Sequence, residues 1–103
     1  MLYENVITKP VYRVLSELTQ ETRPEVALPL ALKELLRLKL SESIEQQRGF
    51  EKKYGASFAE FRRAWEHDEI ADRYSYAVEK DYWEWEAAMT DATRLHEMAE
   101  QLL

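Results

Sequence analysis

Apolar residues recur at helical spacing along most of the chain, and this pattern predicts a mainly α-helical protein. The clearest case is the stretch 74–103. Here apolar positions alternate three and four residues apart, with His96 in the one remaining position (Val78, Tyr82, Trp85, Met89, Ala92, Ala99 and Leu103). Such spacing is typical of a helix that buries one stripe of side chains. We therefore expect one long helix at the C-terminal end.

The first half of the chain predicts a short helix followed by a long one. Pro10 suits the first turn of a helix over 10–20, whose apolar stripe consists of Val11, Val14, Leu15 and Leu18. The second helix, 25–54, is apolar on several sides as far as Leu40. Helices of this kind are buried, so we expect this part to form a core, in the chain itself or in a dimer.

Local signals define the remaining boundaries. Pro29 lacks an N–H group, so the long helix should either begin just before it or kink there. Gly55 is a typical C-terminal stop, and Ser57 with Glu60 forms a capping box that predicts a third helix over 58–67. The first nine residues, which include the β-branched pair Val6 and Ile7, fit either a short edge strand or an arm.

Composition excludes several function classes. The 103 residues fit one domain, and a chain this short favours a dimer. Cysteine is absent, which excludes disulfides, a thiol nucleophile and thiolate zinc sites. There is no signal-peptide pattern and no apolar run of membrane length, so we expect a cytoplasmic protein without a membrane partner.

Charge divides the chain into two regions. Residues 1–54 carry nine Lys/Arg and eight Glu, a net charge of +1, whereas residues 55–103 carry five Lys/Arg and twelve Asp/Glu, a net charge of −7. This asymmetry suggests two tasks. We expect a dimerisation module over 1–56 and an acidic, aromatic, partner-binding region over 57–103, with a single domain as the alternative.

Candidate chemistry is sparse. Neither histidine follows a glutamate by three residues, as carboxylate-bridged metal sites in helical bundles require. Glu79, Glu84 and Glu86 do not share a helix face. Two glycines are too few for a phosphate-binding loop. We therefore expect no cofactor, no metal and no enzymatic activity.

One short motif keeps an enzymatic alternative open. Arg62 and His67 are separated by four residues, and this pair resembles the R-x4–6-H motif of the HEPN class of helical ribonucleases. The resemblance implies an arginine that stabilises phosphate charge and a histidine for acid–base work on RNA. The simpler interpretation is a surface histidine at a helix C-terminus, where a positive charge is favoured.

The order of elements over Val6 to Phe61 carries a second resemblance. A β-branched segment, a proline, a short helix, a capped turn and an apolar helix resemble the ribbon–helix–helix module. The stretch FEKKYGASF (50–58), with Glu60 and Phe61, resembles the extension after that module in small prokaryotic antitoxin-like proteins. The resemblance implies a homodimer with paired N-terminal strands that read DNA. In this chain the strand departs from the family's basic pattern, because Lys9 is its one cation.

These arguments give three sets of candidate residues. The expected dimer core consists of Val14, Leu18, Val26, Leu28, Leu32, Leu35 and Leu36. The expected partner-binding residues are Tyr74, Tyr76, Tyr82, Trp83, Trp85, Glu79, Glu84 and Glu86, which suit a basic, toxin-like protein; the same aromatic residues would alternatively form the chain's own core. The expected DNA contacts are Asn5, Thr8 and Lys9.

Together these features predict a non-enzymatic antitoxin-like or regulatory protein. It would dimerise through residues 10–54 and bind a basic protein through its acidic aromatic C-terminal helix. The alternatives are a helical homo-oligomeric interaction protein without a nucleic-acid role, and a HEPN-like ribonuclease that uses Arg62 and His67.

Overall fold

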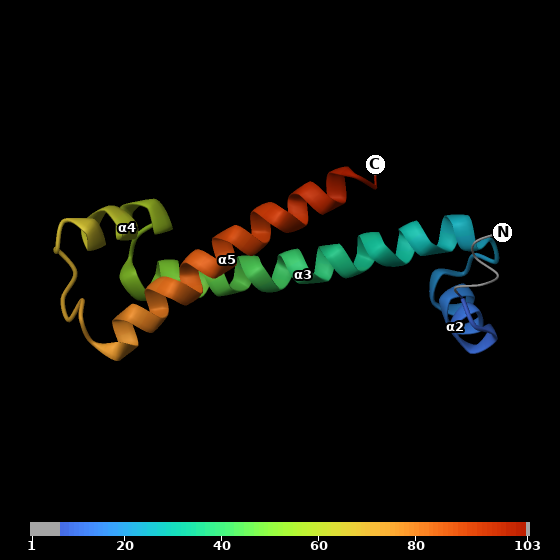
Figure 1. Cartoon of the computed structure of the whole chain (residues 1–103), viewed down its shortest axis with the longest axis horizontal. Helices are drawn as coiled ribbons and strands as arrows, with labels where there is room; N and C mark the ends of the chain where they lie inside the picture. The colour runs from blue at the N-terminus through green and yellow to red at the C-terminus, as the bar shows by residue number, and fades with distance from the viewer. Residues whose placement is uncertain (1–6, 103) are drawn as a thin grey trace.

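The computed structural model describes residues 7–102, and this range is mainly helical, as the sequence predicts (Figure 1). The helices are α2 (Lys9–Thr19), α3 (Pro24–Tyr54), α4 (Phe58–Glu66) and α5 (Tyr76–Glu100). The N-terminal strand considered above falls largely on residues 1–6, which lie outside the described residues. Lys9, the last residue of that segment, is already the first residue of α2.

Helix boundaries follow the local signals closely. The backbone N–H of Glu60 donates to the Ser57 hydroxyl at 3.2 Å, and the Glu60 carboxylate accepts from the Ser57 N–H at 3.0 Å, which completes the predicted capping box of α4. Gly55 ends α3 with a φ of 63°, a left-handed conformation that favours glycine. Pro29 lies inside α3, which begins five residues earlier at Pro24.

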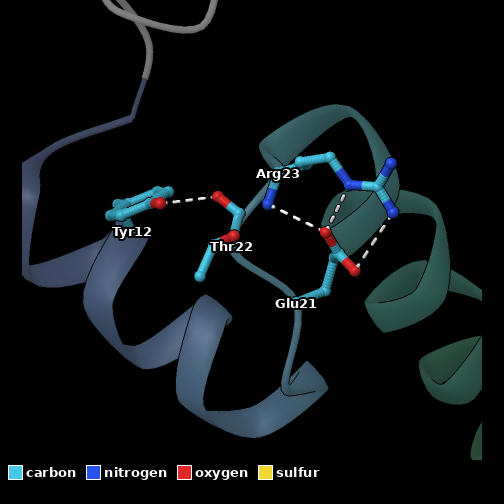
Figure 2. Close-up of polar contacts among 4 residues, drawn as sticks. All are labelled: Tyr12, Glu21, Thr22 and Arg23. Carbon is cyan, nitrogen blue, oxygen red and sulfur yellow. Dashed lines mark hydrogen bonds and ion pairs between the residues drawn. The ribbon is translucent and has the colours of Figure 1, made fainter.

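The turn between α2 and α3 is held by side-chain hydrogen bonds (Figure 2). The Tyr12 hydroxyl donates to the Thr22 carbonyl at 2.5 Å. The Glu21 carboxylate accepts from Nε of Arg23 at 2.6 Å and from its backbone N–H at 3.1 Å. The first bond fixes the beginning of α2 to the connection, and the others hold the connection itself just before α3 begins, so together they limit how α2 can turn relative to α3.

The molecule is elongated, with principal extents of 58 × 24 × 22 Å. Its radius of gyration is 19.7 Å, whereas a compact domain of this length has about 13 Å. Helix α5 packs along α3, α2 packs at the N-terminal end of α3, and the C-terminal end of α5 diverges from α3 (Figure 1). The chain therefore has one well-packed end, around α4, and one open end.

The packed end is built around Trp85, whose side chain has no exposed surface. Its ring lies 5.5 Å from that of Phe50, 5.4 Å from that of Phe58 and 5.1 Å from that of Phe61, measured between ring centroids. These partners belong to α3 and α4, so one residue of α5 joins three helices. Aromatic pairs at such separations stabilise a core beyond the area that they bury.

A buried polar contact connects α3 and α5. The Ser43 hydroxyl of α3 donates to the Ala88 carbonyl of α5 at 2.7 Å, and both residues are buried. Gln47 donates to the same hydroxyl at 3.2 Å. Small side chains at both positions let the helices meet, and the hydrogen bond satisfies a hydroxyl that would be costly to bury alone.

We expect Trp85→Ala to lower the free energy of unfolding by about 3–5 kcal/mol, because it removes the ring around which the core is packed. The matched control is Trp83→Ala, the same substitution two residues away on the exposed side of α5, which should change stability by less than about 0.5 kcal/mol. Urea unfolding followed by far-UV circular dichroism, at one fixed protein concentration, measures both. Equal losses in the two variants would contradict this description of the core.

Candidate partner-binding surface

The outer side of α5 carries an alternating row of aromatic and acidic side chains, which we call the acidic aromatic stripe: Tyr76, Glu79, Trp83 and Glu86. Tyr76 and Trp83 are seven residues apart and therefore lie within about 20° of each other around the helix. They are 79% and 62% exposed. Trp85 points about 160° away from Trp83, into the core, so the stripe faces outward because the opposite face is buried.

Charge reinforces this surface. Helix α5 carries seven acidic and two basic residues, a net charge of −5. Glu84 lies on another face of the helix, where it pairs with Lys80 at 3.6 Å. Aromatic rings of this exposure, bordered by carboxylates, are suited to contact a surface that is both apolar and positively charged.

The structure separates the five aromatic residues that the sequence grouped together. Tyr74, Tyr76 and Trp83 are exposed. Tyr82 packs against Trp65 at a centroid distance of 4.7 Å, and it joins Trp85 in the chain's own core. Tyr82 and Trp85 thus belong to the chain's own core, the alternative that the sequence left open; Trp85 is fully buried, and Tyr82 is partly covered.

A second contact fixes α5 to α3 beside this core. Asp81 of α5 accepts hydrogen bonds from the Lys53 ammonium group and the Tyr54 hydroxyl, each at 2.5 Å. Burial alone would raise the pKa of Asp81, but the hydrogen bonds from Lys53 and Tyr54 outweigh it and lower that pKa. Burial, together with the hydrogen bond to Asp81, raises the pKa of the Tyr54 hydroxyl.

The expected dimer residues lie at the open end of the molecule. Val14, Leu18, Leu32 and Leu35 are exposed in the single chain, with Leu18 at 79%, while Val26, Leu28 and Leu36 are partly covered. Leu30 and Leu38, which the sequence analysis did not single out, are also about half exposed. The sequence pattern already places Leu30 and Leu38 on an apolar surface, since leucine occurs on nearly every side of α3 up to Leu40.

The remaining candidates show no assembled site. Asn5 lies outside the described residues, and Thr8 and Lys9 are exposed at the start of α2. Arg62 and His67 are about 140° apart on their helix. Arg62 pairs with Glu66 at 3.4 Å, and the surface at His67 also carries Glu60 and Glu69. Both residues of the ribonuclease motif therefore lie beside carboxylates.

Within residues 7–102, no cluster of His, Asp and Glu is placed to hold a metal ion. None of the helices in this range has the length and apolar character needed to cross a membrane. No protein-family model, curated protein or solved structure matches the chain. Functional inference therefore depends on the surface itself.

We expect stability to fall at both extremes of pH through the contact between Asp81 and Tyr54. Asp81 has a folded-state pKa below its unfolded value of about 3.9, so its contribution is present above about pH 4 and is lost as pH falls further. The pKa of Tyr54 is raised above about 10, so its contribution is complete below about pH 10 and declines at higher pH.

Urea unfolding across the pH range measures these contributions. Asp81→Asn should flatten the acid side of the stability curve, and Tyr54→Phe the alkaline side. Asp91→Asn, which removes an exposed carboxylate on the same helix, should leave the curve as in the wild type. An Asp81→Asn variant with the wild-type acid dependence would show that this contact does not stabilise the fold.

Proposed function

We propose that this chain is a non-enzymatic, antitoxin-like or regulatory interaction protein. It associates with itself through residues 10–54, and it binds a basic protein partner through the acidic aromatic stripe of α5. The observation that carries the proposal is the exposure of Tyr76 and Trp83 on the outer face of a helix whose inner face is fixed in a core.

The stripe has the composition of a binding hot spot. Trp and Tyr are the residues most enriched among those that dominate binding energy, and a buried aromatic side chain removes roughly 150–250 Å² of surface from water. The helix is already ordered by Trp85 and Asp81, so a partner would not need to order it. Its net charge of −5 would speed encounter with a basic surface.

The open end of the molecule supports self-association. The accessible surface is 8004 Å², whereas a compact monomer of this mass exposes about 6100 Å². Exposed leucine and valine side chains on α2 and the first half of α3 account for part of this difference. Large contiguous apolar patches on the surface of soluble proteins mark interaction sites.

The partner can be found by affinity capture with the full-length chain, followed by binding measurements on the purified pair. We expect the captured protein to be basic and Trp83→Ala to weaken its affinity about 30-fold, a loss of ~2 kcal/mol. Glu79→Gln combined with Glu86→Gln should lower the association rate and reduce its dependence on salt. Isothermal titration calorimetry and stopped-flow kinetics measure these effects.

Leu30→Ala is the control, since it truncates an exposed apolar side chain on α3, away from the stripe. It should bind the partner as the wild type does. Capture of proteins without a basic surface, or equal binding by the Trp83→Ala and wild-type chains, would contradict the proposed role of the stripe.

A further inference from the structure

The C-terminal end of α5 diverges from α3 (Figure 1), and an apolar groove lies between the two helices there. Its volume is about 430 Å³. One wall comes from α3 and the other from the last turns of α5, and the apolar lining consists of Leu32, Leu35, Leu36, Leu95, Met98 and Leu102. Residues 7–102 thus present two apolar walls on either side of an open groove.

Helix α2 carries an apolar ridge that no part of the described chain covers. Val11, Val14 and Leu18 are 56%, 54% and 79% exposed, and they lie within an arc of about 60° on the helix. Leu15 is buried on the neighbouring face, where α2 packs against α3. The hydrogen-bonded turn after α2 (Figure 2) holds this orientation, so the ridge remains outside the chain's own core.

We propose that the ridge of α2 in one copy occupies the groove between α3 and α5 in a second copy, and that the exchange is reciprocal in a two-fold dimer. The proposal rests on the self-association proposed above. It adds that the last turns of α5 form half of each docking site. An exchange of this kind closes on itself, because each copy supplies one ridge and one groove.

The dimensions of the two surfaces agree. The ridge spans eight residues, from Val11 to Leu18, and these seven helical steps cover about 10 Å. On the α5 side, Leu95 and Met98, with Leu102 two residues beyond the end of the helix, have the same i, i+3, i+7 spacing in the sequence, and the apolar residues of the α3 wall extend from Leu32 to Leu36. An amphipathic helix that binds in an apolar groove typically inserts apolar side chains at this spacing.

The charge of α2 is complementary to one of the two groove walls. Helix α2 carries Lys9, Arg13 and Glu17, a net charge of +1. The last part of α5, residues 91–100, has three acidic residues and one arginine, a net charge of −2, whereas the α3 wall, residues 32–39, has a net charge of +2. Charge therefore favours an α2 whose basic residues lie on the α5 side of the groove.

The exposed area is sufficient for such a dimer. The chain exposes ~1900 Å² more than a compact monomer of its mass, and a stable interface buries about 800 Å² on each partner. In Figure 1, α2 and the C-terminal end of α5 lie on opposite sides of α3, so α2 does not occupy the groove of its own chain. A second copy supplies the ridge without any change of fold.

Cysteine crosslinking tests the exchange directly, because the natural sequence contains no cysteine. A Leu18→Cys chain is mixed with a Met98→Cys chain that carries a size tag, and disulfides are formed under mild oxidation. We expect a crosslinked heterodimer of the two chains. Thr93→Cys replaces Met98→Cys in the control, since Thr93 is exposed on the same helix about 140° away, and it should give little crosslink with Leu18→Cys.

Solution mass gives an independent measurement. Leu18→Asp and Met98→Asp should each raise the dimer dissociation constant roughly 100-fold, because both place a charge in an apolar contact. Thr93→Asp adds the same charge outside the groove and should leave the dimer intact. Both substituted side chains are exposed in the single chain, and circular dichroism should confirm that the variants remain folded.

The outcomes separate this inference from the proposed self-association. A wild-type chain that is monomeric at all concentrations would overturn both. A dimer that survives Met98→Asp, or that crosslinks through Leu18 alone, would overturn the groove and leave self-association standing. A disulfide formed within one chain that carries both cysteines would show that α2 reaches its own groove, which also overturns the exchange.

Discussion

The burial of Trp85 is the interaction on which the rest of the structure depends. Its ring contacts Phe50 of α3 and Phe61 of α4, and these contacts hold three helices together at one end of the molecule. Because α5 is a regular helix, the residues that face the core also determine which residues point away from it. The exposure of Tyr76 and Trp83 is therefore a direct consequence of the packing of Trp85.

Apolar side chains are covered differently at the two ends of the molecule. Around α4, aromatic rings cover one another within a single chain. At the other end, no other part of residues 7–102 covers the exposed leucines of α3 and the ridge of α2 in this way, and the molecule is long and open. In our interpretation the partner and the second copy therefore bind at separate places, the partner on the outer face of α5 and the second copy at the open end.

The sequence predicts the helices well because their signals are local. The capping box at Ser57, the stop at Gly55 and the period of the C-terminal stripe each involve neighbouring residues. Whether each aromatic residue is buried or exposed was harder to predict. Helical spacing shows that Trp83 and Trp85 lie on different faces, but which face is covered depends on where the connection after α4 places that helix. The exposure of Leu30 and Leu38 likewise depends on how far α5 runs alongside α3, which the sequence pattern does not encode.

The opposite environments of Trp83 and Trp85 give the protein a built-in optical reporter. An indole in water emits at longer wavelength than an indole enclosed by other rings, so Trp83 contributes at longer wavelength than Trp85 and the partly buried Trp65, which packs on Tyr82. Unfolding would change the emission of the enclosed ring, whereas contact at the outer face of α5 would change that of the exposed one. The same chain can thus report its own integrity and the occupancy of its surface without an added label.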